Sequence, residues 1–522
     1  MNVSRRTVKA GSWHSRRPAM QSCVRLPRRH GSNSPANWSP PQRPAAEMRL
    51  GALLRAAGIN GPILEAASAS ASTEVTGVAH DSRSVRPGDL FCCIPGASHD
   101  GHEFAVEAVR SGASALLGER PLGLTAPTVV VPSVRAAMPL LAAAMHGWPS
   151  RQLDLVGVTG TNGKTSVVHL LTWILGRAGR RTDAHGTLSG GRTTPEATDL
   201  QAMLDRWVSD GVETAAIEVS SHALSQHRVD GTQFALVGFT NLSRDHLDFH
   251  ASMADYEAAK ARLFDGSFAT RALVTVDTPA GGRMAACARR AGMDVTELEV
   301  ATAGGVVRRD GVGFEWRRHP VEVSTPGRFT IANALLAAEM AAALGVRELD
   351  VVDGLASAPS VPGRFEPVPL EGGPMVVVDY AHTPDALSAA LATARELVAG
   401  RLLVVFGCGG GRDRGKRPEM GRIALSGADI VVVTSDNPRG EPPEGVIADI
   451  LSGMDSDPLL VEPDRRSAIA GALRIAGPDD LVLIAGKGHE DTQESEGRLE
   501  PFDDRVVARQ EWARMFPDGG IG

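Results

Sequence analysis

Short apolar runs that end in glycine or polar residues recur along this chain, and stretches with helical spacing separate them. Residues 154–159 form one such run, which ends in a glycine-rich loop. The following residues 167–178 place a set of apolar side chains on one helical face: Val167, Leu170, Leu171, Ile174 and Leu175. This order predicts a strand, a loop and a helix.

Further runs of the same kind predict two parallel sheets. In the middle of the chain, buried strands are expected at 215–220, 236–241 and 272–276, separated by helical stretches as a parallel sheet requires. Nearer the C-terminus, four more strands are expected at 375–379, 402–406, 430–434 and 481–485. Each of these ends in glycine or polar residues, which predicts a doubly wound, Rossmann-like sheet.

The first part of the chain predicts a smaller α/β unit. A helical pattern opens at Met48, short strands are expected around 81–83 and at 90–94, and alanine-rich helices follow. A length of 522 residues suits about three domains. We expect them at 48–151, 152–358 and 359–522, with the last boundary in the Pro- and Ser-containing segment 358–362.

Composition narrows the class of protein. Hydrophobic residues make up 43% of the chain and charged residues 22%, which is ordinary globular usage. No stretch reaches the ~18 apolar residues of a membrane-spanning helix, so we expect no membrane segment. The five cysteines have no metal-ligand spacing, which favours a reducing, cytoplasmic location.

Charge is unevenly distributed along the chain. The net charge is −7, but residues 1–47 carry nine basic residues against Glu47, a net +8, which leaves −15 for the rest. A body this acidic argues against nucleic-acid binding. The leader 1–47 is rich in Ser and Pro and has no apolar core segment, so we expect it to be disordered, and Met48 is an alternative start of the natural chain. Its paired arginines suggest a twin-arginine signal, yet the hydrophobic segment of such a signal is absent.

A glycine-rich loop follows the strand at 154–159. We interpret residues 157–165, GVTGTNGKT, as a P-loop of the type G-x-x-x-x-G-K-[ST], because a strand precedes it and a helix follows. The loop amides and the helix N-terminus then bind phosphates, Lys164 reaches the β and γ phosphates, and the Thr165 hydroxyl is a Mg²⁺ ligand. A P-loop by itself indicates only that a nucleoside triphosphate binds.

Polar residues follow the two neighbouring predicted strands. Glu218 ends one of them in AIEVSSH, and His246 follows the next in NLSRDHLD. Ligands of parallel α/β sheets bind beyond the carboxyl ends of the strands, so these side chains are candidate metal and substrate ligands. Each one, taken singly, is more often a core or capping residue.

A series of motifs resembles one enzyme family over nearly the whole chain after Met48. The motifs are, in order, GTNGKTS, EVSSHALSQHR, TNLSRDHLDFH, DYEAAKARLF, PGRF, DYAHTPDAL, FGCGGGRDRGKRP, SDNPR and AGKGHED. They resemble the Mur ligase family, and within it the members that add the third residue of the peptide. The resemblance implies an α/β fold of three domains that bind, in order, the UDP-sugar, ATP and the incoming amino acid.

The resemblance also implies a reaction. These ligases activate the D-glutamyl carboxylate of UDP-MurNAc-L-Ala-D-Glu with ATP to an acyl phosphate, which an amine then attacks to give an amide, ADP and phosphate. The expected product is a peptidoglycan precursor carrying meso-diaminopimelate, and the expected cofactors are ATP and Mg²⁺. The expected enzyme is cytoplasmic and monomeric, with neither nucleic acid nor a membrane as a partner.

Metal and catalytic roles carry over position by position. Thr165 and Glu218 match the ligands of one Mg²⁺, and His246 matches a ligand of a second. Lys260, in DYEAAK, matches a lysine that this family carbamylates, and the carbamate helps to bind the second metal. Without the resemblance, we would interpret Lys260 as a solvent-exposed lysine on a helix.

Other residues match the family's ligand contacts. The nucleotide set is Gly160, Thr161, Asn162, Gly163, Lys164, Thr165, Ser166, Asn333 and Asp379, and Arg364 matches a catalytic residue that closes the third domain over ATP. The set for the UDP-linked substrate is His80, Ser82, Thr193, Thr194, Ser220, Gln226 and Arg228. As isolated residues, most of these would be surface or capping groups.

The segment SDNPR predicts the amino-acid pocket. Asp436, Asn437, Pro438 and Arg439 follow a predicted strand, and Arg412, Gly486 and Glu490 lie at other strand ends of the same sheet. Arg412 and Arg439 can bind a carboxylate through paired hydrogen bonds, and Asp436 and Glu490 can accept hydrogen bonds from an ammonium group. In the family, DNPR accompanies diaminopimelate, whereas the lysine-adding enzymes lack this arginine.

Two segments depart from the family pattern. The loop from Gly186 to Thr194 is shorter than usual and has Arg192 where asparagine is often found, and VTVDT at 274–278 replaces a usual NADD run. These departures leave alternatives open: use of LL-diaminopimelate, lysine or glutamate by the same kind of ligase, and a regulatory paralogue that retains the P-loop without ligation.

Overall fold

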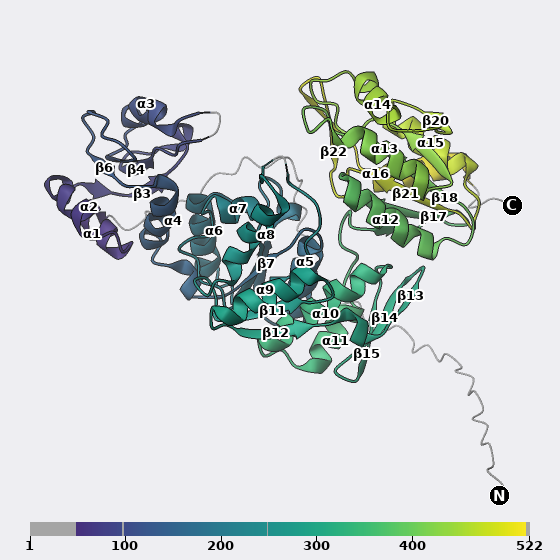
Figure 1. Cartoon of the computed structure of the whole chain (residues 1–522), viewed down its shortest axis with the longest axis horizontal. Helices are drawn as coiled ribbons and strands as arrows, with labels where there is room; N and C mark the ends of the chain where they lie inside the picture. The colour runs from purple at the N-terminus through teal and green to yellow at the C-terminus, as the bar shows by residue number, and fades with distance from the viewer. Residues whose placement is uncertain (1–47, 97–98, 248, 518–522) are drawn as a thin grey trace, which may run out of the picture. The chain divides into compact units, whose positions relative to one another are not determined.

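The computed structural model describes residues 48–96, 99–247 and 249–517. The predicted leader, 1–47, lies outside these residues, and so does Asp248. The resemblance also predicts that the turn at 97–99 meets the uridine and its phosphates, and positions 97–98 of this turn lie outside the described residues. Each of the three predicted ranges contains its own parallel sheet (Figure 1). Among the described residues, no helix combines the length and apolar character needed to cross a membrane.

The N-terminal part is built on a four-stranded sheet in the order β3-β4-β5-β6, with every pair parallel. Its main core joins one face of this sheet to helices α1 and α4. The elements are β1 (Met48–Arg49), α1 (Leu50–Ala56), α2 (Pro62–Ala66), η1 (Ser68–Ser70), β2 (Glu74–Val75), β3 (Gly77–Ala79), η2 (Ser82–Ser84), β4 (Asp89–Cys92), η3 (Gly101–Phe104), α3 (Ala105–Arg110), β5 (Ala115–Gly118), β6 (Thr128–Val130), α4 (Val134–Met145) and η4 (Pro149–Arg151).

The strand predicted around 81–83 is wrong. This segment is the 3₁₀ turn η2, and the strand β3 ends just before it. The Asp81 carboxylate accepts the Arg83 backbone N–H at 3.0 Å and pairs with the Arg83 guanidinium, which stabilises a turn instead of a strand.

The central part contains a six-stranded parallel sheet in the order β12-β11-β10-β7-β9-β8. Helices α5, α10 and α11 pack on one face, and α6 and α9 on the other, so apolar clusters cover both faces. The elements are β7 (Asp154–Thr159), α5 (Lys164–Arg177), β8 (Thr182–His185), η5 (Thr187–Ser189), α6 (Ala197–Ser209), β9 (Thr214–Glu218), α7 (Ser221–Ser225), β10 (Leu236–Phe239), α8 (Met253–Ala261), η6 (Arg262–Phe264), β11 (Arg271–Thr275), α9 (Pro279–Arg290), β12 (Asp294–Leu298), η7 (Val300–Ala303), β13 (Val306–Arg308), β14 (Gly311–Trp316), β15 (His319–Val323), α10 (Arg328–Ala343) and α11 (Glu348–Ala356).

The predicted strands of the central part extend one or two residues too far. β9 ends at Glu218 and β10 ends at Phe239. Beyond β9, the Ser220 hydroxyl accepts the Ala223 N–H at 3.2 Å and caps α7, so the chain has already left the sheet. The P-loop helix also begins earlier than predicted, at Lys164.

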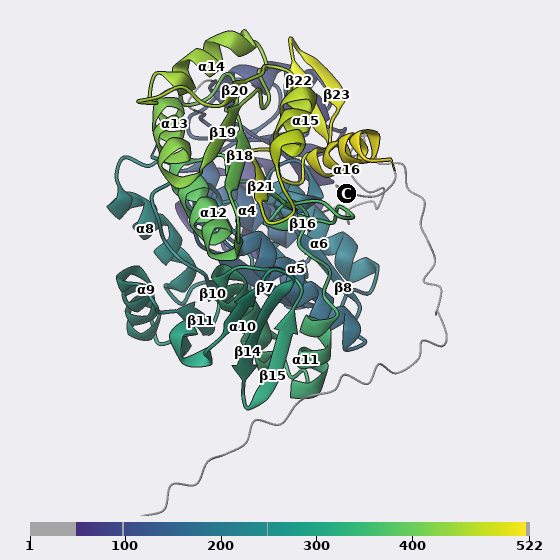
Figure 2. The ribbon, with the colours of Figure 1, turned by 90° about the vertical axis from the view of Figure 1, so that its right-hand side faces the viewer.

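The C-terminal part has a six-stranded sheet in the order β16-β17-β21-β18-β19-β20, parallel except for the edge strand β16. Helices α12, α13 and α14 cover one face, and α15 and α16 the other (Figure 2). The elements are β16 (Glu366–Val368), β17 (Met375–Asp379), α12 (Pro384–Leu397), β18 (Leu402–Phe406), α13 (Lys416–Gly427), β19 (Ile430–Val433), α14 (Pro443–Leu451), β20 (Leu460–Val461), α15 (Arg465–Ile475), β21 (Leu481–Ala485), β22 (Thr492–Ser495), β23 (Arg498–Pro501) and α16 (Asp504–Met515).

Candidate active site

The predicted phosphate-binding turn connects β7 to α5. Gly160 has φ +151° and Gly163 has φ +87°, and a Cβ at Gly163 would lie 2.3 Å from the Asn333 side chain. Gly157 is not the first glycine of the loop: it lies inside β7 against Phe234, and five residues separate it from Gly163. The G-x-x-x-x-G-K-[ST] interpretation was therefore wrong in its first glycine, and the tight turn is made by residues 160–163.

Lys164 begins α5 and lies within the turn. Its Nζ donates hydrogen bonds to the carbonyls of Gly160 and Thr161, both at 2.9 Å. Burial lowers the pKa of this lysine, and the charge of Glu218 opposes that shift. The ammonium therefore lies at the loop, where an anionic ligand would be its strongest partner.

A cavity of about 380 Å³, the P-loop cavity, opens beside this turn. Thr161, Asn162, Gly163, Lys164, Thr165, Ser166, Thr193, Glu218, Ser220, His246, Asn333, Arg364 and Asp379 are the predicted site residues that line it. Gly160 is the member of the predicted nucleotide set that does not line it; its carbonyl holds Lys164 instead. The cavity therefore gathers the phosphate turn, Asn333 and the acids Glu218, Asp245 and Asp379 in one space.

Glu218 and Thr165 are oxygen donors on the wall of the P-loop cavity. The Glu218 carboxylate accepts the Thr187 N–H at 2.8 Å and the Thr187 hydroxyl at 3.2 Å, which fixes its orientation. Arg364 donates to the Thr165 hydroxyl at 3.2 Å. Among the described residues no group of three His, Cys, Asp or Glu side chains could hold a metal ion. The donor set fits Mg²⁺, whose remaining ligands would be phosphate and water oxygens.

Lys260 lies behind the turn and does not line the cavity. It is 1% exposed, its Nζ donates to the Gly160 carbonyl at 2.7 Å, and it lies 4.4 Å from the centre of the Tyr256 ring. Burial and then the charge of Lys164 hold its pKa well below the usual range. The alternative of a solvated helix lysine is wrong, and the neutral amine needed for carbamylation is favoured.

A second cavity, of about 730 Å³, opens at the carboxyl ends of β18, β19 and β21, and we call it the DNPR cavity. The predicted pocket residues that line it are Arg412, Asp436, Asn437, Arg439, Gly486 and Glu490. Pro438 does not line it: its carbonyl accepts the Glu441 N–H, and it packs against Gly410. Six of the seven pocket residues predicted from SDNPR and its partners thus surround one space.

Arg439 and Glu490 already have protein partners. Arg439 donates to the Gly410 carbonyl at 2.9 Å and lies 3.2 Å from the Glu494 carboxylate. Glu490 accepts the Asn437 amide at 2.7 Å and the Lys487 ammonium at 3.3 Å. A carboxylate offers about four acceptor positions, so Glu490 retains capacity for a substrate ammonium.

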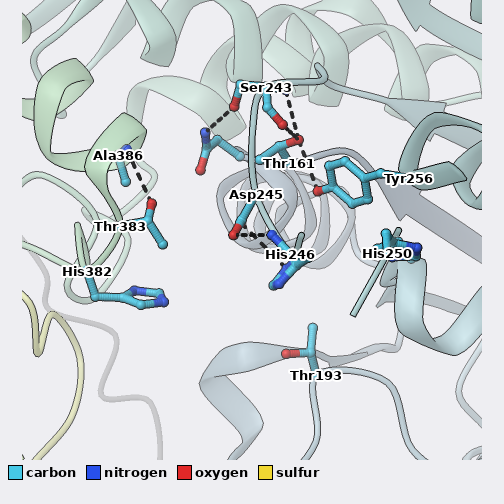
Figure 3. Close-up of polar contacts among 12 residues, drawn as sticks. Thr161, Thr193, Ser243, Asp245, His246, His250, Tyr256, His382, Thr383 and Ala386 are labelled. Atoms are coloured by element: carbon cyan, nitrogen blue, oxygen red, sulfur yellow. Dashed lines mark hydrogen bonds and ion pairs between the residues drawn. The ribbon is translucent and has the colours of Figure 1, made fainter. Parts of the chain in front are cut away.

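The two cavities share part of one wall. Asp245, His246, Tyr380, His382 and Thr383 line both. Figure 3 shows His382 and His246 pointing toward the same open space from different segments.

The tautomer of His382 follows from its contacts. The His382 Nδ1 atom lies 2.8 Å from the Tyr380 carbonyl, so the neutral ring donates through Nδ1 and leaves Nε2 as an acceptor. Burial and then Lys416 lower the pKa of His382.

The residues predicted for the UDP-linked substrate fall into two groups. Thr193 and Ser220 line the P-loop cavity, whereas His80, Ser82, Thr194, Gln226 and Arg228 line neither cavity. Arg228 donates to Gln226 at 2.5 Å and to the Thr194 carbonyl at 3.1 Å, and burial lowers its pKa. His80 pairs with Thr198 at 2.7 Å, and Ser82 with Glu107 at 3.2 Å.

Both departures from the family pattern lie at described positions. Arg192, in the short loop, forms an ion pair of 2.6 Å with Glu196, and Glu196 also lies 3.0 Å from Arg228. Thr275 and Asp277 line a third cavity of about 440 Å³, which shares Thr240, Asn241, Phe329 and other residues with the P-loop cavity. The Asp277 carboxylate accepts the Val300 N–H at 2.9 Å, so this acid orders its own loop.

Sequence reasoning missed several residues of the site. Thr187 orients Glu218, while Tyr380, His382 and Lys416 line the DNPR cavity. His382 could have been predicted from the sequence, because it lies close to Asp379 in the motif DYAHTPDAL. Nothing in the sequence links Thr187, in the shortened loop, to Glu218, which lies far away along the chain.

Family models match three stretches of the chain. Residues 74–148 match the model described as Mur ligase family, catalytic domain, residues 158–341 match the Mur ligase middle domain, and residues 363–488 match the Mur ligase, glutamate ligase domain. The matched stretches contain the three parallel sheets almost entirely. The chain belongs to the Mur ligase family, which confirms the predicted family and three-domain fold.

Individual relatives show which members of the family the chain is similar to. The chain is 43% identical over 475 residues to a protein of Xanthomonas campestris pv. campestris (strain 8004) named UDP-N-acetylmuramoyl-L-alanyl-D-glutamate--2,6-diaminopimelate ligase, covering 86% of this chain and 95% of the relative. A relative of the same name from Xylella fastidiosa (strain 9a5c) is 43% identical over 467 residues, covering 84% and 94%. A solved structure titled with that enzyme name has a TM-score of 0.62 and 33% identity, covering 85% of this chain and 96% of its own.

Proposed function

We propose that this chain is an ATP-dependent ligase that joins meso-diaminopimelate to the D-glutamyl carboxyl group of UDP-MurNAc-L-Ala-D-Glu in peptidoglycan precursor synthesis. The names of relatives 41–43% identical to it support this activity. The observation that carries the proposal is the wall shared by the P-loop cavity and the DNPR cavity. A ligase of this kind needs an activated carboxyl group and an amine to meet, and two cavities with a common wall provide that meeting place.

The P-loop cavity is assigned to ATP. The amides of residues 160–163 and the N-terminus of α5 bind its phosphates, and Lys164 leaves the carbonyls of Gly160 and Thr161 to pair with them. Asn333, which packs on Gly163, is assigned to the adenine side. Arg364 reaches Thr165 from the C-terminal part and adds a second cation beside the phosphates.

Magnesium is assigned to donors on the wall of this cavity and to Lys260 behind the phosphate-binding turn. Thr165 and Glu218 would hold one ion, and His246 together with carbamylated Lys260 would contribute to a second. The bound ions would neutralise phosphate charge as the γ-phosphoryl group is transferred. Thr187 holds the Glu218 carboxylate ready for this role.

The reaction proceeds in two steps. A D-glutamyl carboxylate oxygen attacks the γ-phosphorus of ATP, so that an O–P bond forms and ADP leaves. The amine of diaminopimelate then attacks the acyl carbon, phosphate leaves, and the ammonium proton passes to solvent or a nearby base. Arg228 and its partners Thr194 and Gln226 are assigned to the UDP-linked substrate, with Thr193, Ser220, His80 and Ser82.

The DNPR cavity is assigned to diaminopimelate. Arg439 and Arg412 face it with positive charge, and Asp436 and Glu490 with negative charge, which suits the far zwitterionic end of this amino acid. Burial raises the pKa of Asp436, and the charge of Arg465 is the largest opposing influence. Lysine lacks the far carboxylate that the arginines would bind.

The organisation of the chain is part of the same proposal. We assign the UDP-sugar to residues 48–151, ATP to 152–358 and the amino acid to 359–522, in a monomeric cytoplasmic enzyme. The alternatives are a ligase for LL-diaminopimelate or lysine, and a P-loop regulatory protein without ligation; the ordered Glu218 and the buried Lys260 favour a ligase, because a switch needs neither.

Phosphate release tests the proposal. The purified chain is incubated with ATP, Mg²⁺ and UDP-MurNAc-L-Ala-D-Glu, with meso-diaminopimelate, LL-diaminopimelate, lysine and glutamate supplied together, and the product is identified by mass. We expect phosphate release only when both substrates are present, and a product mass that contains diaminopimelate. Separate incubations with each isomer identify the stereochemistry. Release without the UDP-dipeptide, or a lysine product, would overturn the assignment.

A further inference from the structure

A fully buried ion pair lies beneath the DNPR cavity. Arg465 is the first residue of α15 and Asp504 the first of α16, and both side chains are 0% exposed. The guanidinium donates to the carboxylate in bidentate fashion, from Nε at 2.8 Å and from Nη2 at 2.7 Å. The pair is electrically neutral as a unit, and it fixes the plane of the guanidinium.

The other guanidinium donors bind two backbone carbonyls. Nη1 donates to the Ser435 carbonyl at 3.1 Å, and Nη2 donates to the Ala485 carbonyl at 3.0 Å. Ser435 follows β19 and directly precedes Asp436, whereas Ala485 ends β21 and directly precedes Gly486. One side chain thus joins two strand ends that are far apart in the sequence, each one residue before the cavity wall.

The two joined segments fit closely against each other at the cavity. A Cβ on Gly486, which has φ +116°, would lie 2.8 Å from the Asp436 carboxylate. The Asp436 carbonyl also accepts the Gln493 amide at 2.6 Å. A small displacement of either strand end would therefore move the Asp436 carboxylate relative to Gly486.

We propose that Arg465, oriented by Asp504, is a positioning residue for the amino-acid substrate: by binding the Ser435 and Ala485 carbonyls it sets where Asp436 and Gly486 face the DNPR cavity. This inference rests on the proposed function, because the cavity is assigned there to diaminopimelate. Arg465 does not line the cavity and acts through the two strand ends.

The same sheet offers a matched control at its opposite edge. Arg401 directly precedes β18 and Asp480 directly precedes β21, so this pair lies at the amino ends of the strands. Arg401 donates to the Asp480 carboxylate from Nε at 3.1 Å and Nη2 at 2.7 Å, and to the Ile475 carbonyl at 2.7 Å. The control pair resembles Arg465–Asp504 in chemistry and lines neither cavity, but the Arg401 side chain is half exposed whereas Arg465 is fully buried.

The test compares Arg465→Lys and Asp504→Glu with Arg401→Lys and Asp480→Glu in the full chain. A lysine keeps the charge but cannot make the fork of contacts, and a glutamate displaces the carboxylate by one methylene. We expect the Arg465 and Asp504 variants to raise the KM for diaminopimelate about tenfold, the effect of losing roughly one charge-assisted contact, with the KM for ATP changed less than about twofold. The control variants should lower Tm without changing either KM.

Hydrogen exchange supplies a readout that does not depend on catalysis. In Arg465→Lys we expect faster exchange of the amides in 435–439 and 486–490 than in the rest of the sheet, and no such local change in Arg401→Lys. An unchanged KM for diaminopimelate, or exchange that rises evenly over the sheet, would overturn the positioning role. If Arg465→Lys does not fold, Asp504→Glu gives the decision on the same two measurements.

Different results contradict the proposed function and the positioning role of Arg465. A wild-type chain without diaminopimelate-dependent phosphate release contradicts the proposed function, and the exchange pattern still decides whether Arg465 positions the two segments. An active wild type with an unaffected Arg465→Lys variant contradicts the positioning role alone.

Discussion

The Nζ atom of Lys260 lies 2.7 Å from the carbonyl oxygen of Gly160, 100 positions earlier in the chain, and so contacts the phosphate-binding turn from behind. Lys164 donates to the same carbonyl at 2.9 Å. Two lysine side chains therefore share one acceptor, and burial, followed by the charge of Lys164, holds the pKa of Lys260 well below its usual range. The amine that reacts with carbon dioxide is the neutral one, so this arrangement favours carbamylation.

Lys260→Ala should lose most ligase activity, because both the carbamate oxygens and the contact with Gly160 disappear. A small carboxylate such as acetate should restore part of the activity by replacing those oxygens. The measurement is the ligation rate with and without acetate, together with a ¹³C carbamate signal after exposure to ¹³CO₂ in wild type and variant. Wild type with added acetate is the control, and full activity of the variant in carbon dioxide-free buffer would remove Lys260 from the mechanism.

Lys164→Ala should reduce the ligation rate by ~10² to 10³, because the phosphates lose a preorganised cation. The fold should persist, since the hydrogen bonds of the Lys164 side chain with described residues go to two carbonyls of its own loop. Thr172→Ala is a matched control on the same helix, because its hydroxyl donates to the Val168 carbonyl within the helix and lies away from the phosphate-binding turn. The rate and Tm of both variants decide the matter: near-normal ligation by folded Lys164→Ala protein would exclude this turn as the ATP site.

Arg439→Ala should reduce the preference for diaminopimelate over lysine. In the wild type, lysine would leave Arg439 with its protein partners Gly410 and Glu494 but without a substrate carboxylate. A site built to hydrogen-bond a substrate group discriminates by ~10⁴ or more against an analogue that lacks the group. The alanine variant should lower kcat/KM for diaminopimelate far more than it weakens ATP binding. Arg439 has φ +56°, a conformation equally costly for alanine, so the backbone strain is matched between the two proteins.

Arg414→Ala provides the control for this selectivity. Arg414 is exposed, pairs with Glu441 at 2.7 Å and does not line the DNPR cavity. The quantity to compare is the ratio of kcat/KM for diaminopimelate and lysine in the three proteins. A wild-type ratio near one, or a ratio that Arg439→Ala leaves unchanged, would refute Arg439 as the selector.

His489 should make the protein sensitive to mild acid. Burial, and then the charges of Arg364 and Arg505, lower the pKa of His489 from 6.5 to about 4. Between these two values the unfolded chain binds a proton that the folded chain does not, so stability should fall as the pH falls from 6.5 toward 4. His489→Gln should make the urea midpoint less dependent on pH across this window.

His319→Gln serves as the control for the acid effect, because His319 lies on a different sheet and pairs with Glu348 at 3.3 Å. Urea midpoints of the three proteins at several pH values give the comparison. An identical pH dependence in wild type and His489→Gln would mean that other groups cause the acid sensitivity.

The strands that the sequence predicted best are those buried on both faces. β17, β18 and β21 begin and end at the predicted residues, because a central parallel strand is a continuous apolar run with polar residues at each end. The antiparallel sheet β13-β14-β15 was not predicted, although Asp310 and Gly311 form a turn signal between its first two strands. Its exposed charged residues obscured the alternation of apolar positions.

The site residues that lie in the sequence motifs were predictable. The P-loop cavity and the DNPR cavity contain most of the residues that the motifs named, because ligands of parallel sheets gather at the carboxyl ends of strands. The contact of Thr187 with Glu218 and the contacts of Arg465 with two strand ends were not predictable, since each depends on tertiary packing between distant segments. The placement of Lys260 behind the turn has the same origin.

The common wall of Asp245, His246, Tyr380, His382 and Thr383 has a consequence for inhibitor design. A single molecule that carries a nucleotide-like group and an amino-acid-like group could occupy both spaces across this wall. Once one group is bound, the other is held at an effective concentration set by the linker, in the millimolar range for a short flexible one. Such a bisubstrate compound should bind ~10² to 10⁴ times more tightly than either half, without any new contact to the protein.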